Sequence, residues 1–597
     1  MNASSPLEEY QRRLQNRRDA AGRCARSGDR IATARGAVFL IGLLLVWLVT
    51  SSPALPESVI MAPVLVFLGL VVCHGRMISQ LKRAQGAVAH YESAVDRLEE
   101  RWIGVGASGD RYADKEHVYS GDLDVFGRGS LFQLLCRART RLGEDTLASW
   151  LSNPADVSTV RARQAAVDEI RGKLDLREEL ALLDAEVHED LDQNCLQTWA
   201  AETPQPVPVG FRGIAVVLSA LSIAALLSWL LLNTRVSYFL IVLVAQAAFT
   251  FRFRKHIRHL AHTADQAGSG LAILSQVLGI VEREQFQTER LKTIREQLNT
   301  DGLPPSCCIA LLHRLIQSLN NSLQNQFFAP IAFMLCLPIH LIHRIELWRM
   351  RVGPHISDWF DAVGEFESLV AIAGHAYERP ADPFPELTEG GPLLEAEDLG
   401  HPLLSVAECV RNDLELSPQK QLILVSGSNM SGKSTLLRTV GTNVVLALAG
   451  APVRAKRLKL SPLQLGTEMR VSDSLQDGKS LFYAVLSRLK TVVELTKNER
   501  PLLFLLDEIL QGTNSHDRRI GAEGIIRRLV ESGAVGLVTT HDLALTQIVD
   551  SFDSRAVNVH FEDQLVDGKM TFDYRIHTGV VERSNALELM RMIGLDV

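Results

Sequence analysis

The sequence has no excess of positive charge, no cysteine pair at zinc-ligand spacing and no short apolar segment at its start. The formal net charge is −7 over 597 residues, so any contact with nucleic acid must come from a local patch. The eight cysteines are scattered, and Cys307 and Cys308 are merely adjacent, which is typical of reduced thiols in the cytoplasm. The first 35 residues are polar and arginine-rich, which does not fit a cleaved export signal.

Apolar residues are unevenly distributed and concentrate in four runs, near 36–50, 60–73, 213–232 and 236–251. Each run approaches the roughly 20 residues that a helix needs to cross a bilayer, although the first two are short. The runs pair across brief connectors, SSPALPES and NTR, and the first of these contains no lysine or arginine. The pattern predicts two transmembrane helical hairpins, at 36–76 and 213–251. The alternative is two buried hairpins of a soluble core.

The flanks of these runs indicate an orientation. Arginine-rich residues 1–35 precede the first run, and basic residues also follow the second and fourth runs: Arg76, Lys82, Arg83, Arg252, Arg254, Lys255 and Arg258. Since basic flanks favour the cytoplasmic side, both hairpins are expected to enter from and return to the cytoplasm. We therefore predict a multi-pass protein of the inner (cytoplasmic) membrane. The basic tail is then a topology signal in preference to a DNA-binding arm.

The remaining sequence before the last domain is mainly helical by pattern. Apolar residues recur at three- and four-residue spacing among charges, as in GLAILSQVLGIVEREQF. This predicts a helical connector at 77–118, a core domain whose first part covers 119–210, and a helical core and lever region at 252–380. The segment ERPADPFPELTEGGP is rich in proline and glycine and is expected to be a linker. It leads into the last domain, at 388–597.

The strongest local signal is the segment QLILVSGSNMSGKSTLL. An apolar run typical of a buried strand, Leu422–Val425, precedes G-x-x-x-x-G-K-S from Gly427 to Ser434, and a helical pattern follows. This order is what a phosphate-binding P-loop requires. Its glycines let successive N–H groups face a phosphate, and the helix N-terminus adds a favourable dipole. Lys433 is expected to reach the β- and γ-phosphates of ATP, and Ser434 is expected to hold Mg²⁺.

Two further apolar strands end in polar groups that suit phosphate chemistry. In PLLFLLDEILQGTNSHDRR, the strand Leu502–Leu506 ends at Asp507, which is expected to bind the metal. Glu508 follows and is expected to orient and deprotonate the attacking water. The strand in AVGLVTT delivers His541, which is placed to sense the γ-phosphate. Because such strand ends meet at the carboxyl edge of a parallel sheet, the sequence predicts an α/β P-loop NTPase domain that hydrolyses ATP.

A fifth apolar stretch, Phe327–Ile342, is shorter and is interrupted by Pro330, Pro338 and His340. If it crossed the membrane, the odd number of spans would place the ATP-binding segment outside the cell, whereas ATP is cytoplasmic. We therefore expect this stretch to be buried or re-entrant.

The segments GSNMSGKST, DEILQGTNSHDR and TTHD, in this order and spacing, resemble the ATPase domain of the MutS mismatch-repair family. The segment SDSLQDGKSLFYAVLSRLK, HPLL at His401 and NDLEL at Asn412 agree with it. Upstream, Leu123–Ile170 resembles the start of the MutS core domain, and DWFDAVGEFESLVAIAGHAYERP resembles the lever helices. The resemblance covers roughly 118–200 and 356–597, a little over half of the chain. It implies an ABC/MutS-type fold for the last domain.

Carried over to this sequence, the resemblance implies a homodimer with composite ATP sites at its interface. Asp507 and Glu508 would be metal ligand and base. The phosphates and Mg²⁺ would be held by one loop and the residues after it: Gly427, Ser428, Asn429, Met430, Ser431, Gly432, Lys433, Ser434 and Thr435. Ser480 is expected to reach the γ-phosphate bound by the partner. Tyr574 lies where the family places a ring against adenine, and the alternative is a strand-facing core aromatic.

The sequence also departs from the family. The usual Gly-Pro-Asn-Met-Gly becomes GSNMS at 427–431, which keeps the phosphate-facing glycines and Lys433. The mismatch-reading domain is expected to be missing, because about 118 residues precede the core in this sequence and two apolar runs occupy them. The one FPE, at Phe384–Glu386, lies in the linker, and no clamp domain is evident. These departures predict a membrane-tethered relative and not a mismatch-repair MutS itself.

Two functions remain open on the sequence. The first is a homodimeric ATPase clamp that closes on ATP binding, engages DNA near the membrane and reopens after hydrolysis. The second is an ATP-driven membrane scaffold or remodelling protein without DNA binding. A transporter is weaker, since no LSGGQ-type signature precedes Asp507. DNA affinity rests largely on basic side chains, and the candidates on the core domain, unless they form an ordinary solvated helix face, are Arg137, Arg139, Arg141, Arg161 and Arg163.

Overall fold

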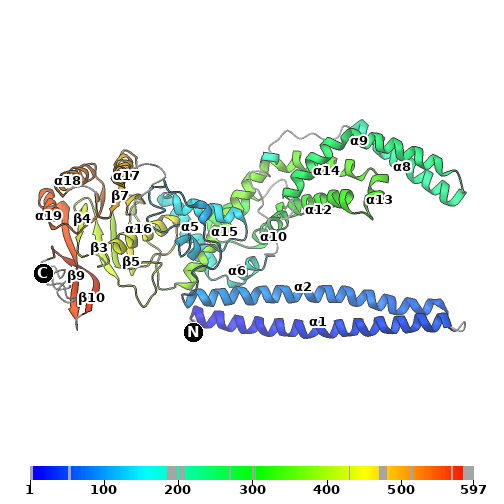
Figure 1. The fold of residues 1–597 in the computed structure, drawn as a ribbon, viewed down its shortest axis with the longest axis horizontal. Coiled ribbons are helices and arrows are strands. Elements are labelled where there is room, and N and C mark those ends of the chain that lie inside the picture. Colours follow the sequence, from blue (N-terminus) through cyan, green and yellow to red (C-terminus); the bar gives the residue numbers. More distant parts are fainter. Residues whose placement is uncertain are drawn as a thin grey trace. The chain divides into compact units, whose positions relative to one another are not determined.

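The computed structural model describes residues 5–51, 56–183, 198–200, 209–267, 270–298, 302, 304–428, 431–469, 481–510, 515–566 and 569–581. The chain divides into two compact units. The first comprises Met1–Trp102 and Leu174–Leu183, and the second comprises Ile103–Lys173 and Asp184–Val597. Figure 1 shows the helices and strands of both units.

The first unit is built on two long antiparallel helices, α1 (Pro6–Ser51) and α2 (Met61–Leu98), with the 3-10 helix η1 (Glu57–Ile60) before α2 (Figure 1). The basic tail and the first apolar run form one continuous helix, because helical backbone hydrogen bonds form whether the side chains are polar or apolar. Near the turn the apolar side chains are exposed, with Trp47 62% accessible. Near the other end Tyr91 is buried.

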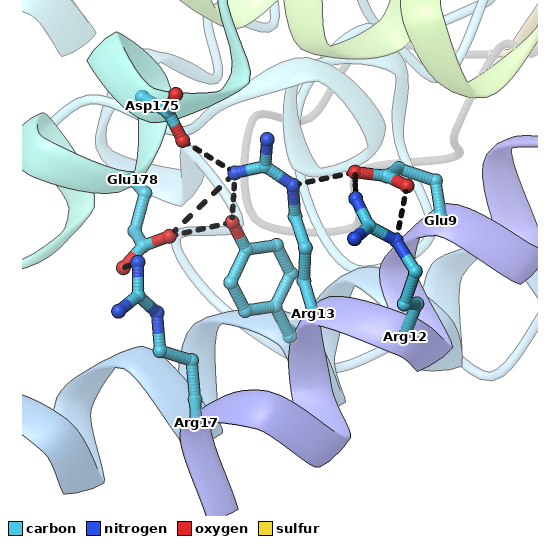
Figure 2. Close-up of polar contacts among 7 residues, drawn as sticks. Glu9, Arg12, Arg13, Arg17, Asp175 and Glu178 are labelled. Carbon is cyan, nitrogen blue, oxygen red and sulfur yellow. Dashed lines mark hydrogen bonds and ion pairs between the residues drawn. The ribbon is translucent and has the colours of Figure 1, made fainter. Parts of the chain in front are cut away.

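A polar network holds the third helix of this unit, α6 (Leu174–Ala181), against the hairpin (Figure 2). The Tyr91 hydroxyl donates to Glu178 Oε2 at 2.7 Å, and Arg13 Nη1 pairs with Asp175 Oδ1 at 2.6 Å. Tyr91 and Glu178 are both buried. Because a buried polar group without a partner is costly, this network ties α6 to the hairpin as one folded unit.

Three helices of the described residues are long and apolar enough to cross a membrane, by length and composition: Pro6–Ser51, Ser58–Leu98 and Gly210–Leu232. Helix Val236–Arg252 is apolar but shorter. These segments coincide with the four apolar runs, so the structure makes each run helical. That the helices form membrane hairpins stays a prediction.

Two groups of helices precede the sheets in the second unit. The first group surrounds α15 (Ile356–Glu378), which is buried along most of its length because α4, α5 and α11 pack against it. Its other members are η2 (Asp110–Tyr112), α3 (Leu131–Leu135), α4 (Arg141–Ser152), α5 (Val157–Arg171) and α11 (Glu289–Gln297). The second group contains α8 (Val209–Leu232), α9 (Val236–Ala267), α10 (Gly270–Arg283), α12 (Pro305–Gln324), α13 (Ala329–Met334), α14 (Leu337–Val352) and η3 (Gly353–His355).

Two mixed sheets form the C-terminal part of the second unit (Figure 1). The larger sheet has the order β10-β9-β4-β8-β7-β6, in which only β10 is antiparallel to its neighbour. Its strands are β4 (Leu422–Ser426), β6 (Gln464–Glu468), β7 (Leu502–Leu506), β8 (Val535–Thr540), β9 (Ala556–Val566) and β10 (Lys569–Thr578). Every residue of β4, β7 and β8 is buried, which explains why these strands are continuous apolar runs.

Helices connect the parallel strands of the larger sheet. They are α16 (Lys433–Ala449), α17 (Leu481–Leu495), α18 (Ser515–Glu531), α19 (Leu543–Thr546) and η4 (Gln547–Arg555). The smaller sheet has the order β1-β5-β2-β3, with β1 (Glu386–Leu387), β2 (Leu394–Leu399), β3 (Asn412–Leu416) and β5 (Arg457–Leu460). The fold is therefore mostly helical, with an α/β layer in its last third.

Candidate active site

The carboxyl ends of three neighbouring strands bring the predicted site residues together. Strand β8 lies between β4 and β7, and its register pairs Ser426 with Thr540 and Val538 with Leu506. Each strand is therefore followed at the same edge of the sheet by polar residues. This is the arrangement that the sequence pattern predicts for a ligand-binding edge.

The loop after β4 turns sharply into helix α16. Gly427 has φ 151° and Gly432 has φ 103°, which side-chain-bearing residues rarely adopt. The Lys433 ammonium folds back over the loop and donates to the carbonyl oxygens of Gly427 and Ser428, both at 2.8 Å. Asn429 and Met430 lie outside the described residues.

Lys433 lies in the field of both predicted acidic residues. Burial lowers the pKa of Lys433, while the nearby carboxylates of Glu508 and Asp507 raise it. The side chain is 95% buried, since only 5% of its surface is accessible. A buried cation that is bonded to loop carbonyls and lies in the field of two carboxylates is suited to an anionic ligand that also brings a metal.

Asp507 and Glu508 share one positioning residue, Thr539. Its hydroxyl donates to Asp507 Oδ1 and accepts a hydrogen bond from the Glu508 backbone N–H at 2.9 Å. Glu508 adopts a left-handed backbone conformation, with φ 51°. His541 Nδ1 lies 3.5 Å from Glu508 Oε1. Sequence reasoning missed Thr539, although its place at the end of a buried strand, two residues before His541, was an available signal.

The loop fits a phosphate group by its unpaired donors. The hydroxyls of Ser428 and Ser431 are buried and have no hydrogen-bond partner among the described residues. Ser434 and Thr435 lie in the first turn of α16, where free backbone N–H groups favour an anion. The described residues contain no cluster of three or more His, Cys, Asp or Glu side chains that would bind a metal alone. A Mg²⁺ ion here fits a set made of one carboxylate, a serine hydroxyl and phosphate oxygens.

Of the two remaining predicted site residues, the structure describes Tyr574 but not Ser480. The Tyr574 ring lies over the loop, and a Cβ at Gly432 would be 3.0 Å from it. Asn412 fixes this position, because its Nδ2 donates to the Tyr574 carbonyl at 3.0 Å and its Oδ1 accepts from the Ile576 N–H at 2.8 Å. Tyr574 is 42% exposed, so it is not a core aromatic. Ser480 lies outside the described residues.

A third carboxyl group, Glu468 at the end of β6, was not foreseen. Burial, together with the nearby carboxylates of Asp122 and Asp507, raises its pKa to about 8. The Asp507 backbone N–H donates to the Glu468 carbonyl at 2.8 Å. Glu468 is thus part of the wall behind Asp507.

The five arginines considered as a DNA-binding surface are not equivalent. Arg163 is buried, with its guanidinium 3.6 Å from the Trp150 ring centroid. Arg161 donates to the Leu387 carbonyl at 2.7 Å, and Arg137 donates to the Leu134 carbonyl at 2.9 Å. Arg139, Arg141 and Arg161 are exposed, and Arg141 Nε lies 3.9 Å from Asp145 Oδ2.

Comparison with known proteins matches the region that contains this site. Residues 423–596 match the family model described as MutS domain V. DNA mismatch repair protein MutS 2 of Halobacterium salinarum is 30% identical over 239 residues, which cover 39% of this chain and 26% of that protein. DNA mismatch repair protein MutS of Shouchella clausii is 29% identical over 259 residues, with coverages of 41% and 29%.

A plant protein gives a similar match. DNA mismatch repair protein MSH6 of Arabidopsis thaliana is 32% identical over 271 residues, which cover 42% of this chain and 20% of that protein. The chain therefore spans less than a third of the length of these curated relatives.

Proposed function

This chain belongs to the MutS family, and from that premise we propose that it is a membrane-anchored ATPase that switches a dimeric assembly between ATP-bound and released states. The observation that carries the proposal is the convergence of Lys433, Asp507, Glu508 and His541 at one edge of a parallel sheet. The α/β layer is then a P-loop NTPase domain, with ATP and Mg²⁺ as its cofactors.

Each residue has a chemical role in this proposal. Lys433 neutralises the β- and γ-phosphates, and the loop Gly427–Gly432 surrounds them with N–H and hydroxyl donors. Asp507 and Ser434 hold Mg²⁺, which when bound offsets the charge that develops on the phosphates. Glu508 accepts a proton from the attacking water, and His541 orients the γ-phosphate end of the site.

The site is incomplete within one chain. By the family resemblance, Ser480 completes a partner's site, so the proposed assembly is a homodimer with two composite sites. The Tyr574 ring, which lies beside Gly432, is the proposed adenine contact. ATP binding would draw the two ATPase domains together, and hydrolysis would release them.

The apolar helices supply the proposed membrane anchor. Many apolar side chains on α1, α2, α8 and α9 are exposed, and a bilayer would cover them. The ATPase domain is placed in the cytoplasm because its substrate is there. The proposed location is the inner (cytoplasmic) membrane.

The test is ATP hydrolysis by the detergent-solubilised full chain beside Glu508→Gln. The variant is expected to retain ATP binding and to lose hydrolysis by at least about a hundredfold, because it keeps the size of the side chain and loses the base. Binding is measured with a fluorescent ATP analogue. Hydrolysis by Glu508→Gln at the parent rate would overturn the proposal.

The same assay decides between the two cellular roles. Duplex, mismatched and branched DNA are added separately, and a DNA-dependent rate supports an ATPase clamp on DNA without a mismatch-specific reader. A rate that is the same with every DNA supports the second candidate, an ATP-driven membrane scaffold. The burial of Arg163 and the internal hydrogen bonds of Arg137 and Arg161 favour the scaffold, because they reduce the candidate basic surface.

A further inference from the structure

The helical backbone is interrupted by a sharp break between helices α13 and α14. Cys336, at the break, has a left-handed backbone with φ 46°. Pro338 follows, and since proline has no N–H, it cannot donate to the carbonyl of Met334 four residues earlier. The Met334 carbonyl therefore needs another donor.

Two side chains from a different hairpin supply that donor. Ser222 Oγ, on α8, donates to the Met334 carbonyl at 3.1 Å, and Gln246 Nε2, on α9, donates to it at 2.9 Å. Both side chains have 0% accessible surface. One polar group from each helix of the hairpin thus holds the α13–α14 break in place.

The depth of this contact along the hairpin is defined by the helix ends. Ser222 lies about ten residues before the end of α8 at Leu232, and Gln246 lies about ten after the start of α9 at Val236, or roughly 15 Å from the turn. That is about half of the 30 Å hydrocarbon core. A bilayer spanned by α8 and α9 would therefore have the break near its middle.

The half of the hairpin that packs on α13 and α14 also presents apolar side chains outward. Ile214 is 47% exposed, Val217 is 56% exposed, and Phe251 is 65% exposed. If lipid covers these side chains, it also reaches α13, which packs on both α8 and α9. The elbow between α12 and α13 and the start of α13 also expose apolar side chains, since Phe327 is 91% exposed and Ile331 is 50% exposed.

We propose that residues 325–341 form a re-entrant segment that enters the cytoplasmic half of the bilayer, contacts acyl chains through Phe327 and Ile331, and returns. The proposal rests on the membrane anchoring proposed above. Irregular backbone is tolerated at membrane depth where protein buries it, and the Ser222 and Gln246 bonds meet that condition. The segment and hairpin then form one membrane-embedded bundle, and α14 leads through η3 into α15 and the cytoplasmic domain.

The first experiment places single cysteines in the full chain, in membranes, with the other cysteines except the buried Cys336 replaced by alanine. Phe327→Cys and Ile331→Cys are expected to resist a membrane-impermeant maleimide from both faces and to react after denaturation. Arg314→Cys is the control for the cytoplasmic face and Thr234→Cys the control for the opposite face. Labelling of Phe327→Cys from the cytoplasmic face at the rate of Arg314→Cys overturns the re-entrant segment.

A separate pattern would identify failure of the membrane anchor itself. Labelling of both Thr234→Cys and the mid-hairpin Leu221→Cys from the cytoplasmic face would show that α8 and α9 do not span. To separate lipid from a protein cover, a bimane fluorophore on Phe327→Cys is tested with lipids brominated on their acyl chains. Quenching supports contact with lipid, and its absence overturns it.

The second experiment tests whether the hydrogen bonds from Ser222 and Gln246 to the Met334 carbonyl, here called the lock, hold the break in place. Ser222→Ala combined with Gln246→Leu leaves the Met334 carbonyl unpaired, so the break is expected to loosen and Cys336 to react with a membrane-permeant maleimide at least about tenfold faster. Ser228→Ala is the matched control, since Ser228 bonds only Thr234 near the turn among the described residues. Equal Cys336 reactivity in the double variant and the control overturns the lock.

Discussion

Thr539 is the residue that links the two acidic groups of the candidate site. Its hydroxyl donates to Asp507 and accepts from the Glu508 backbone, and the side chain is fully buried. Thr539→Val removes both bonds at nearly constant volume, so the ATPase rate is expected to fall about 10- to 100-fold. Thr539→Ser is expected to restore most of the rate. Steady-state phosphate release measures this, and equal rates for the valine and serine variants would contradict a positioning role.

Glu367, on α15, gives a pH-dependent prediction away from the candidate site. Burial raises its pKa from an ordinary value of 4.5 to about 7, although it accepts hydrogen bonds from Thr140 and from the Arg139 N–H. A raised acid pKa means that the folded protein holds the proton more tightly. The stability that the proton contributes is complete below pH 4.5 and is lost as the pH rises through about 7.

Glu367→Gln removes this titration. The difference in melting temperature between variant and parent is expected to shift in favour of the variant as the pH rises through that window. Burial lowers the pKa of His375 to about 3, which has the opposite effect on stability, but His375 is present in both proteins and its effect cancels. The measurement is thermal unfolding of both proteins at several pH values. A constant difference would show that Glu367 does not titrate there.

At the level of elements, α15 packs so closely on α4 that one position admits no side chain. A Cβ at Gly364 would clash with Thr146 Oγ1 and lie 2.9 Å from the Leu142 carbonyl. Gly364→Ala is therefore expected to cost about 1–3 kcal/mol. Gly524, on α18, has nothing within 4 Å of such a Cβ, so Gly524→Ala is expected to stabilise by up to about 1 kcal/mol. Thermal unfolding of both variants checks this, and a destabilised Gly524→Ala would contradict the packing argument.

Those elements with a strong local signal were predictable from the sequence. The strands at Leu422–Ser426 and Leu502–Leu506 are buried on both faces, so their continuous apolar runs marked them before the structure was known. The boundary near residue 35 was drawn on polarity, whereas α1 continues through it. The Met334 contact with Ser222 and Gln246 joins residues about 90 to 110 positions apart, and no local pattern specifies such a pairing.

The candidate site also combines residues that local sequence patterns predict with residues that they do not indicate. The sequence placed Lys433, Asp507 and Glu508 correctly after buried strands, because motif spacing and strand pattern are local. It did not indicate Thr539 or Glu468, whose roles depend on which strands are neighbours. The order β4-β8-β7-β6 brings them to Asp507, and strand order is a property of the whole sheet.

At the level of the whole molecule, the proposed dimer makes the two halves of each ATP site separable by mutation. Lys433→Ala disables the loop of its own chain, and Ser480→Ala disables the site of the partner chain. Each homodimer then has two defective sites. In a mixed dimer, one site combines an intact Lys433 with an intact Ser480, and the other carries both defects.

Mixing the two variants, which are each nearly inactive alone, is therefore expected to restore about a quarter of the parent ATPase rate, since random pairing gives half mixed dimers with one intact site each. The chains are mixed in detergent at equal concentration, allowed to exchange, and assayed for phosphate release.

The control mixes Lys433→Ala with Glu508→Gln. Lys433 and Glu508 both belong to the part of the ATP site that one chain supplies by itself, so no combination of these two chains forms an intact site. In that control each loop carries one lesion, so the rate stays at background. Recovery with Ser480→Ala but not with Glu508→Gln requires that Ser480 act across the interface, whereas no recovery in either mixture would place the complete site within one chain.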